Sequence, residues 1–197
     1  MKAIETEYNG YRFRSRLEAR WAVFFDALGI RYEYEPEGFE LSDGTLYLPD
    51  FYLPDSKSWF EVKGEMDPDS AHKIDLFIKE GNYMTIGYPD FEFNSMNYWW
   101  PEGPFDFVGS ESSWLCECNH CGKKYFIGNV GSWACPCCGA YDGDGHFSIL
   151  GEGDPKHLYY NSGEFERAIN AAKRARFEHG ENVAAQKRYE KAFMTRW

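Results

Sequence analysis

The sequence has no apolar run approaching the roughly twenty residues that a membrane-spanning helix requires, which argues against a transmembrane segment. The amino terminus, Met-Lys-Ala-Ile-Glu-Thr-Glu, lacks the apolar stretch of a secretory signal peptide, so we expect a cytoplasmic protein. Internal repeats and low-complexity tracts are also absent. The chain has 197 residues, of which 19% are aromatic, and this is enough for one packed core domain with small additions.

Positive charge is scarce: 21 Lys and Arg residues are outnumbered by 32 Asp and Glu residues, which gives a net charge of −11. This balance argues against a protein that binds DNA tightly and without selectivity. The charge is uneven, because residues 1–31 carry a net +2, residues 156–197 a net +4, and the segment between them −17. We therefore expect a substrate held by the ends of the chain, or a protein partner that supplies affinity for DNA.

A short hairpin is the most informative feature that the sequence does contain. The aromatic, β-prone segments 51–53 and 58–60 flank Pro54–Lys57, a cluster of turn-forming residues. This pattern is typical of a hairpin with a loop of about four residues. In such a hairpin, Leu53 lies opposite Ser58.

The same register places two acidic side chains at the open end of the hairpin. Asp50 lies opposite Glu61, and like charges at directly opposed positions repel each other. Lys63 shares a strand face with Glu61, because side chains alternate with a period of two. Two opposed carboxylates and a lysine predict a site for a hard divalent cation with oxygen ligands.

Pro49-Asp50 followed by Glu61-Val62-Lys63 resembles the signature of the PD-(D/E)XK nuclease superfamily, the restriction-endonuclease-like fold. The segment Phe13–Ala22 resembles the first helix of small phage and bacterial members, whose acidic residue joins the metal site. The resemblance covers roughly residues 8–88 and implies an α/β core with the element order αβββαβ. It also implies that Glu18, Asp50 and Glu61 hold Mg²⁺ or Mn²⁺, while Lys63 positions the attacking water or stabilises the phosphate.

Some of these residues have simpler interpretations. Ser15 and Glu18 have the spacing of a capping box, which would make Glu18 a helix-start residue and no ligand. Glu61 and Lys63 could form an ordinary exposed ion pair. Asp55, the other Pro-Asp aspartate, falls at the tip of the hairpin and is rejected as a ligand, whereas Glu65 could be a spare one.

Hydrophobic periodicity and turn signals predict the elements around this site. Helices are expected where apolar residues recur at helical spacing, and strands where apolar or aromatic residues alternate or form short runs. The expected elements are a helix over 15–28 ended by Gly29, strands over 30–35, 39–41 and 45–53, a helix from Pro68 to Gly81, and a strand over 83–88.

Two cysteine pairs predict a zinc site. Each pair has the form C-x2-C-Gly, and thirteen residues separate the two pairs. Paired knuckles of this kind each provide two thiolates to a tetrahedral Zn²⁺. This spacing resembles a zinc ribbon with a structural Zn²⁺ bound by Cys118, Cys121, Cys135 and Cys138.

Other assignments of the six cysteines remain open. Cys116 and Cys137 are surplus, so a shifted ligand set is possible, and His120 or His146 could replace one thiolate. Six cysteines could also pair as disulfides, but a reducing cytoplasm disfavours them. The doublet Cys137-Cys138 suits a zinc knuckle better than a disulfide scaffold.

The chain divides into three predicted parts. Residues 1–112 form the PD-(D/E)XK nuclease-like core, residues 113–150 the zinc ribbon, and residues 151–197 a helical C-terminal segment. That segment is expected to contain one helix from a capping box at Asn161–Glu164 to about residue 179, and a second over 181–197.

Two classes of function follow. The first is a metal-dependent endonuclease that hydrolyses phosphodiester bonds in DNA, structure-selective or nicking, of a phage or prophage type that acts in the host cytoplasm. The second is a catalytically idle nuclease-fold protein that binds nucleic acid or protein through its zinc ribbon. The enzyme is favoured, because a binding protein has no chemical need to keep opposed carboxylates beside Lys63. RNA is an alternative substrate.

Overall fold

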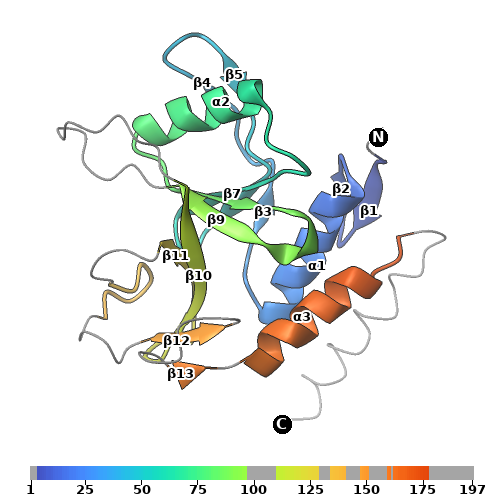
Figure 1. Ribbon diagram of the computed structural model, residues 1–197, viewed down its shortest axis with the longest axis vertical. Helices are drawn as coiled ribbons and strands as arrows, with labels where there is room; N and C mark the ends of the chain where they lie inside the picture. The colour runs from blue at the N-terminus through green and yellow to red at the C-terminus, as the bar shows by residue number, and fades with distance from the viewer. Residues whose placement is uncertain are drawn as a thin grey trace.

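The computed structural model describes residues 4–96, 110–128, 134–140, 147–150, 159–160 and 162–177 (Figure 1). Within these residues the protein is a mixed α/β structure with one nine-stranded sheet, two small two-stranded sheets and three α-helices. The strands of the large sheet are, in spatial order, β13 (Tyr159–Tyr160), β12 (Phe147–Leu150), β10 (Ser110–Cys118), β9 (Phe93–Met96), β8 (Met84–Gly87), β7 (Ser58–Val62), β6 (Phe51–Leu53) and β3 (Glu33–Tyr34), with β11 (Lys124–Gly128) also paired to β10.

Local sequence signals fix the ends of the first two helices. Ser15 caps α1 (Arg16–Leu28) at its start by accepting a hydrogen bond from the Glu18 backbone, and Gly29 ends it with a left-handed φ of 67°. Asp67 caps α2 (Pro68–Lys79), whose first residue is proline. Both helices were predicted from these residues, and both predictions are confirmed.

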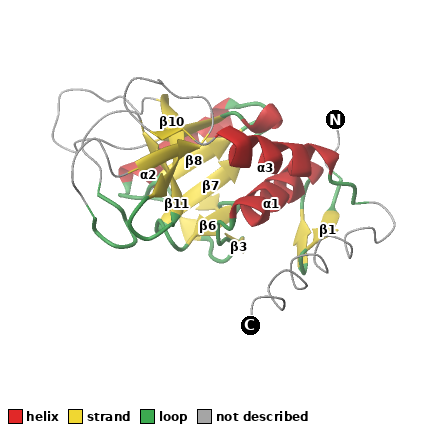
Figure 2. Cartoon of the chain, turned by 90° about the horizontal axis from the view of Figure 1, so that it is seen from below, coloured by secondary structure: helices red, strands yellow, loops and turns green. Residues whose placement is uncertain are grey.

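The helices cover opposite faces of the sheet (Figures 1 and 2). On one face, α1 packs against the large side chains Phe51 and Phe60, and α3 (Ser162–Arg174) packs on α1 through residues such as Phe165. On the other face, α2 and the small hairpin formed by β4 (Phe39–Glu40) and β5 (Leu46–Tyr47) enclose a second core around Trp59. Within the described residues, no helix has the length and apolarity needed to cross a bilayer.

The strands differ from the sequence prediction mainly in length. The expected strand over 30–35 is reduced to β3, and the expected strand over 45–53 is split into β5 and β6. Pro49 lies between the two pieces and has no N–H for a sheet hydrogen bond. Between α1 and α2 the chain forms five strands, of which β3, β6 and β7 belong to the large sheet while β4 and β5 form a separate hairpin; β8 follows α2 and is parallel to β7.

The predicted boundary between core and ribbon falls inside a strand. The first part of β10 pairs with β9 of the core sheet, and its second part pairs with β11 and β12. The ribbon hairpin is therefore continuous with the large sheet. In the C-terminal segment α3 ends at Arg174, earlier than predicted, whereas Asn161 and the predicted helix over 181–197 lie outside the described residues.

A buried aspartate at the hairpin tip joins the ribbon to the core. Asp55 lies in the β6–β7 turn and is 9% exposed. Its carboxylate accepts hydrogen bonds from the Arg31 guanidinium and, at 3.2 Å, from Lys123 Nζ of the ribbon. These two cations, Arg31 first, hold the pKa of the Asp55 carboxyl below its usual 3.8.

We expect Asp55→Asn to lower the free energy of unfolding by about 1 kcal/mol at pH 7, because the substitution removes a buried, charge-assisted anchor whose cationic partners are partly exposed. A depressed carboxyl pKa contributes stability above the unfolded-state pKa, and this contribution is lost as the pH falls through the folded-state pKa. The difference between parent and variant should therefore be full at pH 7 and disappear as the pH falls below about 4.

Urea unfolding at several pH values measures this difference. Asp75→Asn is the matched control, because Asp75 forms a partly exposed helical pair with Lys79 at 3.0 Å and should change stability little. A loss of stability for Asp55→Asn that is the same at pH 3 and pH 7 would contradict the ion-pair account.

Candidate functional site

The hairpin has the register that the sequence predicted. Leu53 pairs with Ser58 and Phe51 with Phe60, so the next position along places Asp50 opposite Glu61. Both side chains are buried, with 4% exposure for Asp50 and 3% for Glu61. The structure therefore brings together the two carboxylates on which the predicted cation site depends.

Backbone hydrogen bonds fix the two carboxylates reciprocally. The Asp50 N–H donates to Glu61 Oε2 at 3.2 Å, and the Val62 N–H donates to Asp50 Oδ2 at 2.8 Å. Lys63 Nζ lies 2.7 Å from Glu61 Oε1, and its side chain is only 21% exposed. The Glu61–Lys63 pair is thus largely buried, which corrects the alternative of an ordinary exposed ion pair.

Arg14 is a site residue that the sequence did not reveal. Its Nη2 lies 2.9 Å from Asp50 Oδ1, and its Nε lies 2.6 Å from Glu35 Oε1. Arg14 immediately precedes the helix cap, and Asp50 is 36 residues away in sequence. No local pattern predicts such a contact, because it depends on how the start of α1 meets the end of the sheet.

Glu18 lies next to Asp50 and Glu61, but both oxygens of its carboxylate already accept hydrogen bonds. Its Oε1 accepts from Ser15 Oγ at 2.6 Å, and its Oε2 accepts from Tyr34 Oη at 2.6 Å and from the Arg14 N–H at 3.0 Å. The capping interaction expected for Ser15 and Glu18 is present on the Ser15 side. Glu18 therefore stabilises the start of α1, and its burial at 7% exposure also places it at the acidic site.

The two other acidic candidates differ in position. Asp55 lies in the turn at the far end of the hairpin, as predicted, and is bonded to Arg31 and Lys123. Glu65 is exposed and lies beyond the end of β7. Neither contributes to the contacts of Asp50 and Glu61.

The electrostatics of the acidic site favour an added cation. Burial raises the pKa of the Asp50 carboxyl well above its usual 3.8, and the nearby charges of Glu61 and Glu18 raise it further. Arg14 and the Val62 N–H oppose this shift only in part. A hard divalent ion would relieve the repulsion, and carboxylate oxygens are its preferred ligands, so Asp50 and Glu61 suit Mg²⁺ or Mn²⁺ chemically.

The carboxylates do not, however, form a cluster of three ligands as they stand. Within the described part of the chain, the only group of three or more acidic, histidine or cysteine side chains gathered at metal-binding distance is a set of four cysteines. Both oxygens of Glu18 and both oxygens of Asp50 instead accept hydrogen bonds within the protein. Binding of an ion at Asp50 and Glu61 would require the Arg14 guanidinium to give up its contact with Asp50.

The four cysteines have the geometry of a zinc site. Their Sγ atoms lie within 4.8 Å of one another, with 3.8 Å between Cys118 and Cys138 and 3.6 Å between Cys121 and Cys135. A tetrahedral Zn²⁺ with Zn–S bonds of about 2.3 Å requires Sγ separations of about 3.8 Å. All six cysteines are free thiols, so the disulfide alternative is not realised.

Two equivalent turns present these thiols. In each knuckle the glycine adopts a left-handed φ, 69° at Gly122 and 70° at Gly139, and its N–H donates at 2.8 Å to the carbonyl of the first cysteine. The pKa of Cys135 is lowered to about 7: burial raises it, but the N–H groups of Cys138 and Cys137 outweigh that effect. A low thiol pKa favours the thiolate that zinc binds.

The surplus cysteines lie outside this set. Cys116 is fully buried, where burial raises its pKa to about 12, and it is not part of the cluster. Cys137 is exposed and is not part of the cluster. His120 is also absent from it, whereas His146 lies outside the described residues.

The ribbon hairpin does not present a basic edge. Lys123 binds Asp55, and Lys124 Nζ lies 3.2 Å from both Glu117 and Glu164. Tyr125, the next residue, is 1% exposed. These side chains connect the ribbon to the β6–β7 hairpin and to α3, so the contacts that the structure shows for them lie within the protein.

A scan against models of known protein families and a search of curated proteins both found no match to this chain. The zinc site and the acidic site are therefore defined by their own geometry.

We expect protein purified without added zinc to contain about one zinc per chain, because four thiols are already gathered at tetrahedral spacing. Cys121→Ser and Cys138→Ser should each lose most of the bound metal and lower the melting temperature. Elemental analysis and thermal unfolding measure both effects.

Cys137→Ser is the matched control, since Cys137 adjoins a ligand yet lies outside the cluster, and it should keep its zinc. A well-folded parent protein without zinc, or loss of zinc in the control alone, would contradict the assignment.

Proposed function

We propose that this protein is a Mg²⁺- or Mn²⁺-dependent endonuclease that hydrolyses phosphodiester bonds in DNA. The observation that carries the proposal is the buried pair Asp50 and Glu61, opposed across β6 and β7, with Lys63 bound to Glu61. The resemblance of these residues to the PD-(D/E)XK signature and the order of the surrounding elements support it.

Each residue has a definite task in this proposal. Asp50 and Glu61 hold the divalent ion, with Glu18 as a third acidic group beside them. When bound, the ion lowers the pKa of a water and neutralises charge on the phosphate and the leaving oxygen. Lys63, bound to Glu61, stabilises the negative charge that develops on the phosphate.

Arg14 gives the site a second positive group. Its guanidinium neutralises Asp50 and Glu35. Because a guanidinium also binds phosphate oxygens in a bidentate manner, Arg14 would be able to contact a phosphate of the substrate beside Asp50. The side chain is 55% exposed, so it is accessible for this contact.

A second candidate is a nuclease-fold protein that binds nucleic acid or a protein partner and does not cut. The observation that favours it is the same Arg14 contact, because Arg14 and Lys63 already balance Asp50 and Glu61 without a metal. In this alternative the zinc ribbon serves as the docking surface, and the partner supplies the affinity that the net charge of −11 does not.

We expect the protein to cleave DNA in the presence of Mg²⁺ or Mn²⁺, and Asp50→Asn and Lys63→Met each to reduce the rate at least about 100-fold. Asp50→Asn removes a metal ligand, and Lys63→Met removes a positive charge while preserving apolar bulk. A cleavage screen over duplex, single-stranded, branched and RNA substrates provides the measurement. Zinc content and circular dichroism establish that the variants are folded.

Asp75→Asn and Lys79→Met are the matched controls, since this partly exposed pair lies on α2 and has no contact with the site residues, and both should cut at the parent's rate. Equal cleavage by Asp50→Asn and the parent would place the reaction elsewhere. Absence of cleavage on every substrate, combined with measurable nucleic-acid binding, would favour the second candidate.

A further inference from the structure

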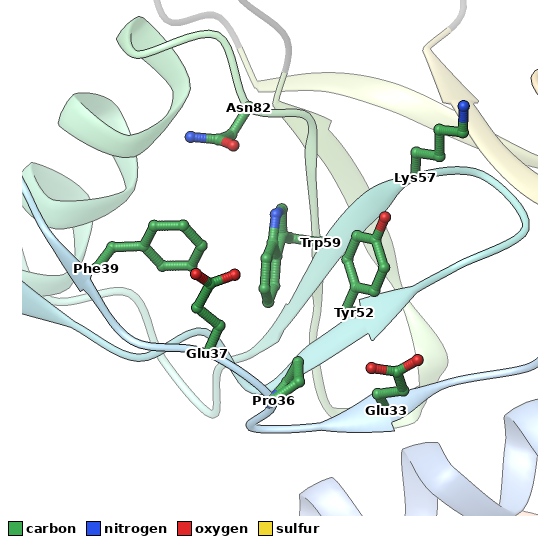
Figure 3. A pocket seen from close by; sticks show the side chains of 8 residues that line it. All are labelled: Glu33, Pro36, Glu37, Phe39, Tyr52, Lys57, Trp59 and Asn82. Carbon is green, nitrogen blue, oxygen red and sulfur yellow. The ribbon is translucent and has the colours of Figure 1, made fainter.

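An aromatic groove lies on the same side of the hairpin as the acidic pair. It is a hollow of about 710 Å³ between β3, β6, β7 and the start of β4, and it opens to solvent. Figure 3 shows the rings of Phe39, Trp59 and Tyr52 standing side by side along it, with Glu33 and Glu37 at its rim. None of these residues has a role in the metal site.

The groove and the acidic pair are neighbours on one strand face. Tyr52 pairs with Trp59, and Asp50 and Glu61 lie two residues further along the same two strands. Side chains two residues apart share a face and are separated by about 7 Å along the strand. Asp50 and Glu61 do not line the groove themselves, but a nucleotide whose phosphate lay at this pair would have its base within reach of the groove.

The walls of the groove suit a flat ring. The centroids of Tyr52 and Trp59 are 4.9 Å apart, and those of Phe39 and Trp59 are 5.2 Å apart with the rings perpendicular. Trp59 is buried, whereas Tyr52 and Phe39 are half-buried and remain partly accessible. Base–aromatic stacking on such side chains is a main source of affinity for single-stranded nucleic acid.

The charged side chains at the rim of the groove determine which ligands it can bind. The exposed carboxylates of Glu33 and Glu37 repel a phosphate, but they accept hydrogen bonds from exocyclic amino groups, as acidic side chains do from cytosine N4. Lys57, at the hairpin-loop end of the groove, repels a cationic side chain and attracts the next phosphate of a strand. These charges favour an uncharged base carrying an amino group.

We propose that this groove binds one unstacked, amino-bearing nucleobase, such as cytosine, next to the phosphate held at Asp50 and Glu61. The proposal rests on the proposed function and makes single-stranded or locally unpaired DNA the preferred substrate. A base inside a duplex is stacked and paired, so it cannot enter the groove.

Binding, measured without cleavage, tests the groove independently of the enzyme activity. Full-length, zinc-containing Asp50→Asn protein is titrated against fluorescein-labelled oligo-dC, oligo-dT and a duplex, with fluorescence anisotropy as the readout. We expect oligo-dC to bind more tightly than oligo-dT, and both more tightly than the duplex. Adding Tyr52→Leu should weaken single-strand binding about 5- to 100-fold and leave duplex binding unchanged.

Matched variants distinguish a loss of base stacking from a loss of folding and from a change of charge. Tyr52→Phe keeps the ring and should retain single-strand binding, and Tyr83→Leu removes an exposed tyrosine outside the groove and should have no effect. Glu33→Gln with Glu37→Gln should reduce the preference for oligo-dC over oligo-dT. These two side chains are exposed, so folding should not be disturbed.

Unchanged single-strand affinity in folded Tyr52→Leu protein would overturn the proposal. Tight binding of a labelled lysine-rich peptide that is lost in Tyr52→Leu, without single-strand binding, would also overturn it and assign the groove to a cationic protein segment. If the parent cuts DNA but Tyr52→Leu binds normally, the groove assignment alone fails. Tyr52-dependent binding of oligo-dC without any cleavage by the parent would support the groove and refute the nuclease.

Discussion

The structure depends on the burial of two opposed carboxylates at the end of the central hairpin. Asp50 and Glu61 are almost completely removed from water, which is unfavourable for charged groups and doubly so for like charges. N–H groups of the hairpin backbone donate hydrogen bonds to both carboxylates. Lys63 compensates the charge of Glu61, and Arg14 compensates the charge of Asp50. Apolar residues would serve stability alone equally well here, so these buried charges support the proposed cation site.

The sequence predicted those features that short-range rules control. The four-residue turn at Pro54–Lys57 set the register of β6 and β7, and this register alone placed Asp50 opposite Glu61. Ser15, Gly29 and Asp67 marked helix ends through local hydrogen bonds and a left-handed φ. Cysteine spacing gave the correct four thiols, because each C-x2-C-Gly turn is a local structure.

Contacts between residues far apart in the sequence could not be predicted from these short-range rules. The Arg14 contacts with Asp50 and Glu35 join segments far apart in the sequence, as does the contact between Lys123 and Asp55. Lys123 and Lys124 are likewise engaged in internal ion pairs, which only the tertiary structure reveals. Strand β10 belongs both to the core sheet and to the ribbon, so the ribbon is joined to the core through this strand and through the ion pair between Lys123 and Asp55.

The central claim is that Asp50 and Glu61 form a divalent-cation site, and its most direct test is a Mn²⁺ titration of the zinc-containing protein followed by electron paramagnetic resonance. The account predicts saturable binding of Mn²⁺ at neutral pH that is abolished by Asp50→Asn and unaffected by Asp75→Asn. Binding should also weaken as the pH falls, because protons compete for a carboxyl whose pKa is raised by burial. Absence of saturable binding at neutral pH, or equal binding by Asp50→Asn and the parent, would contradict it.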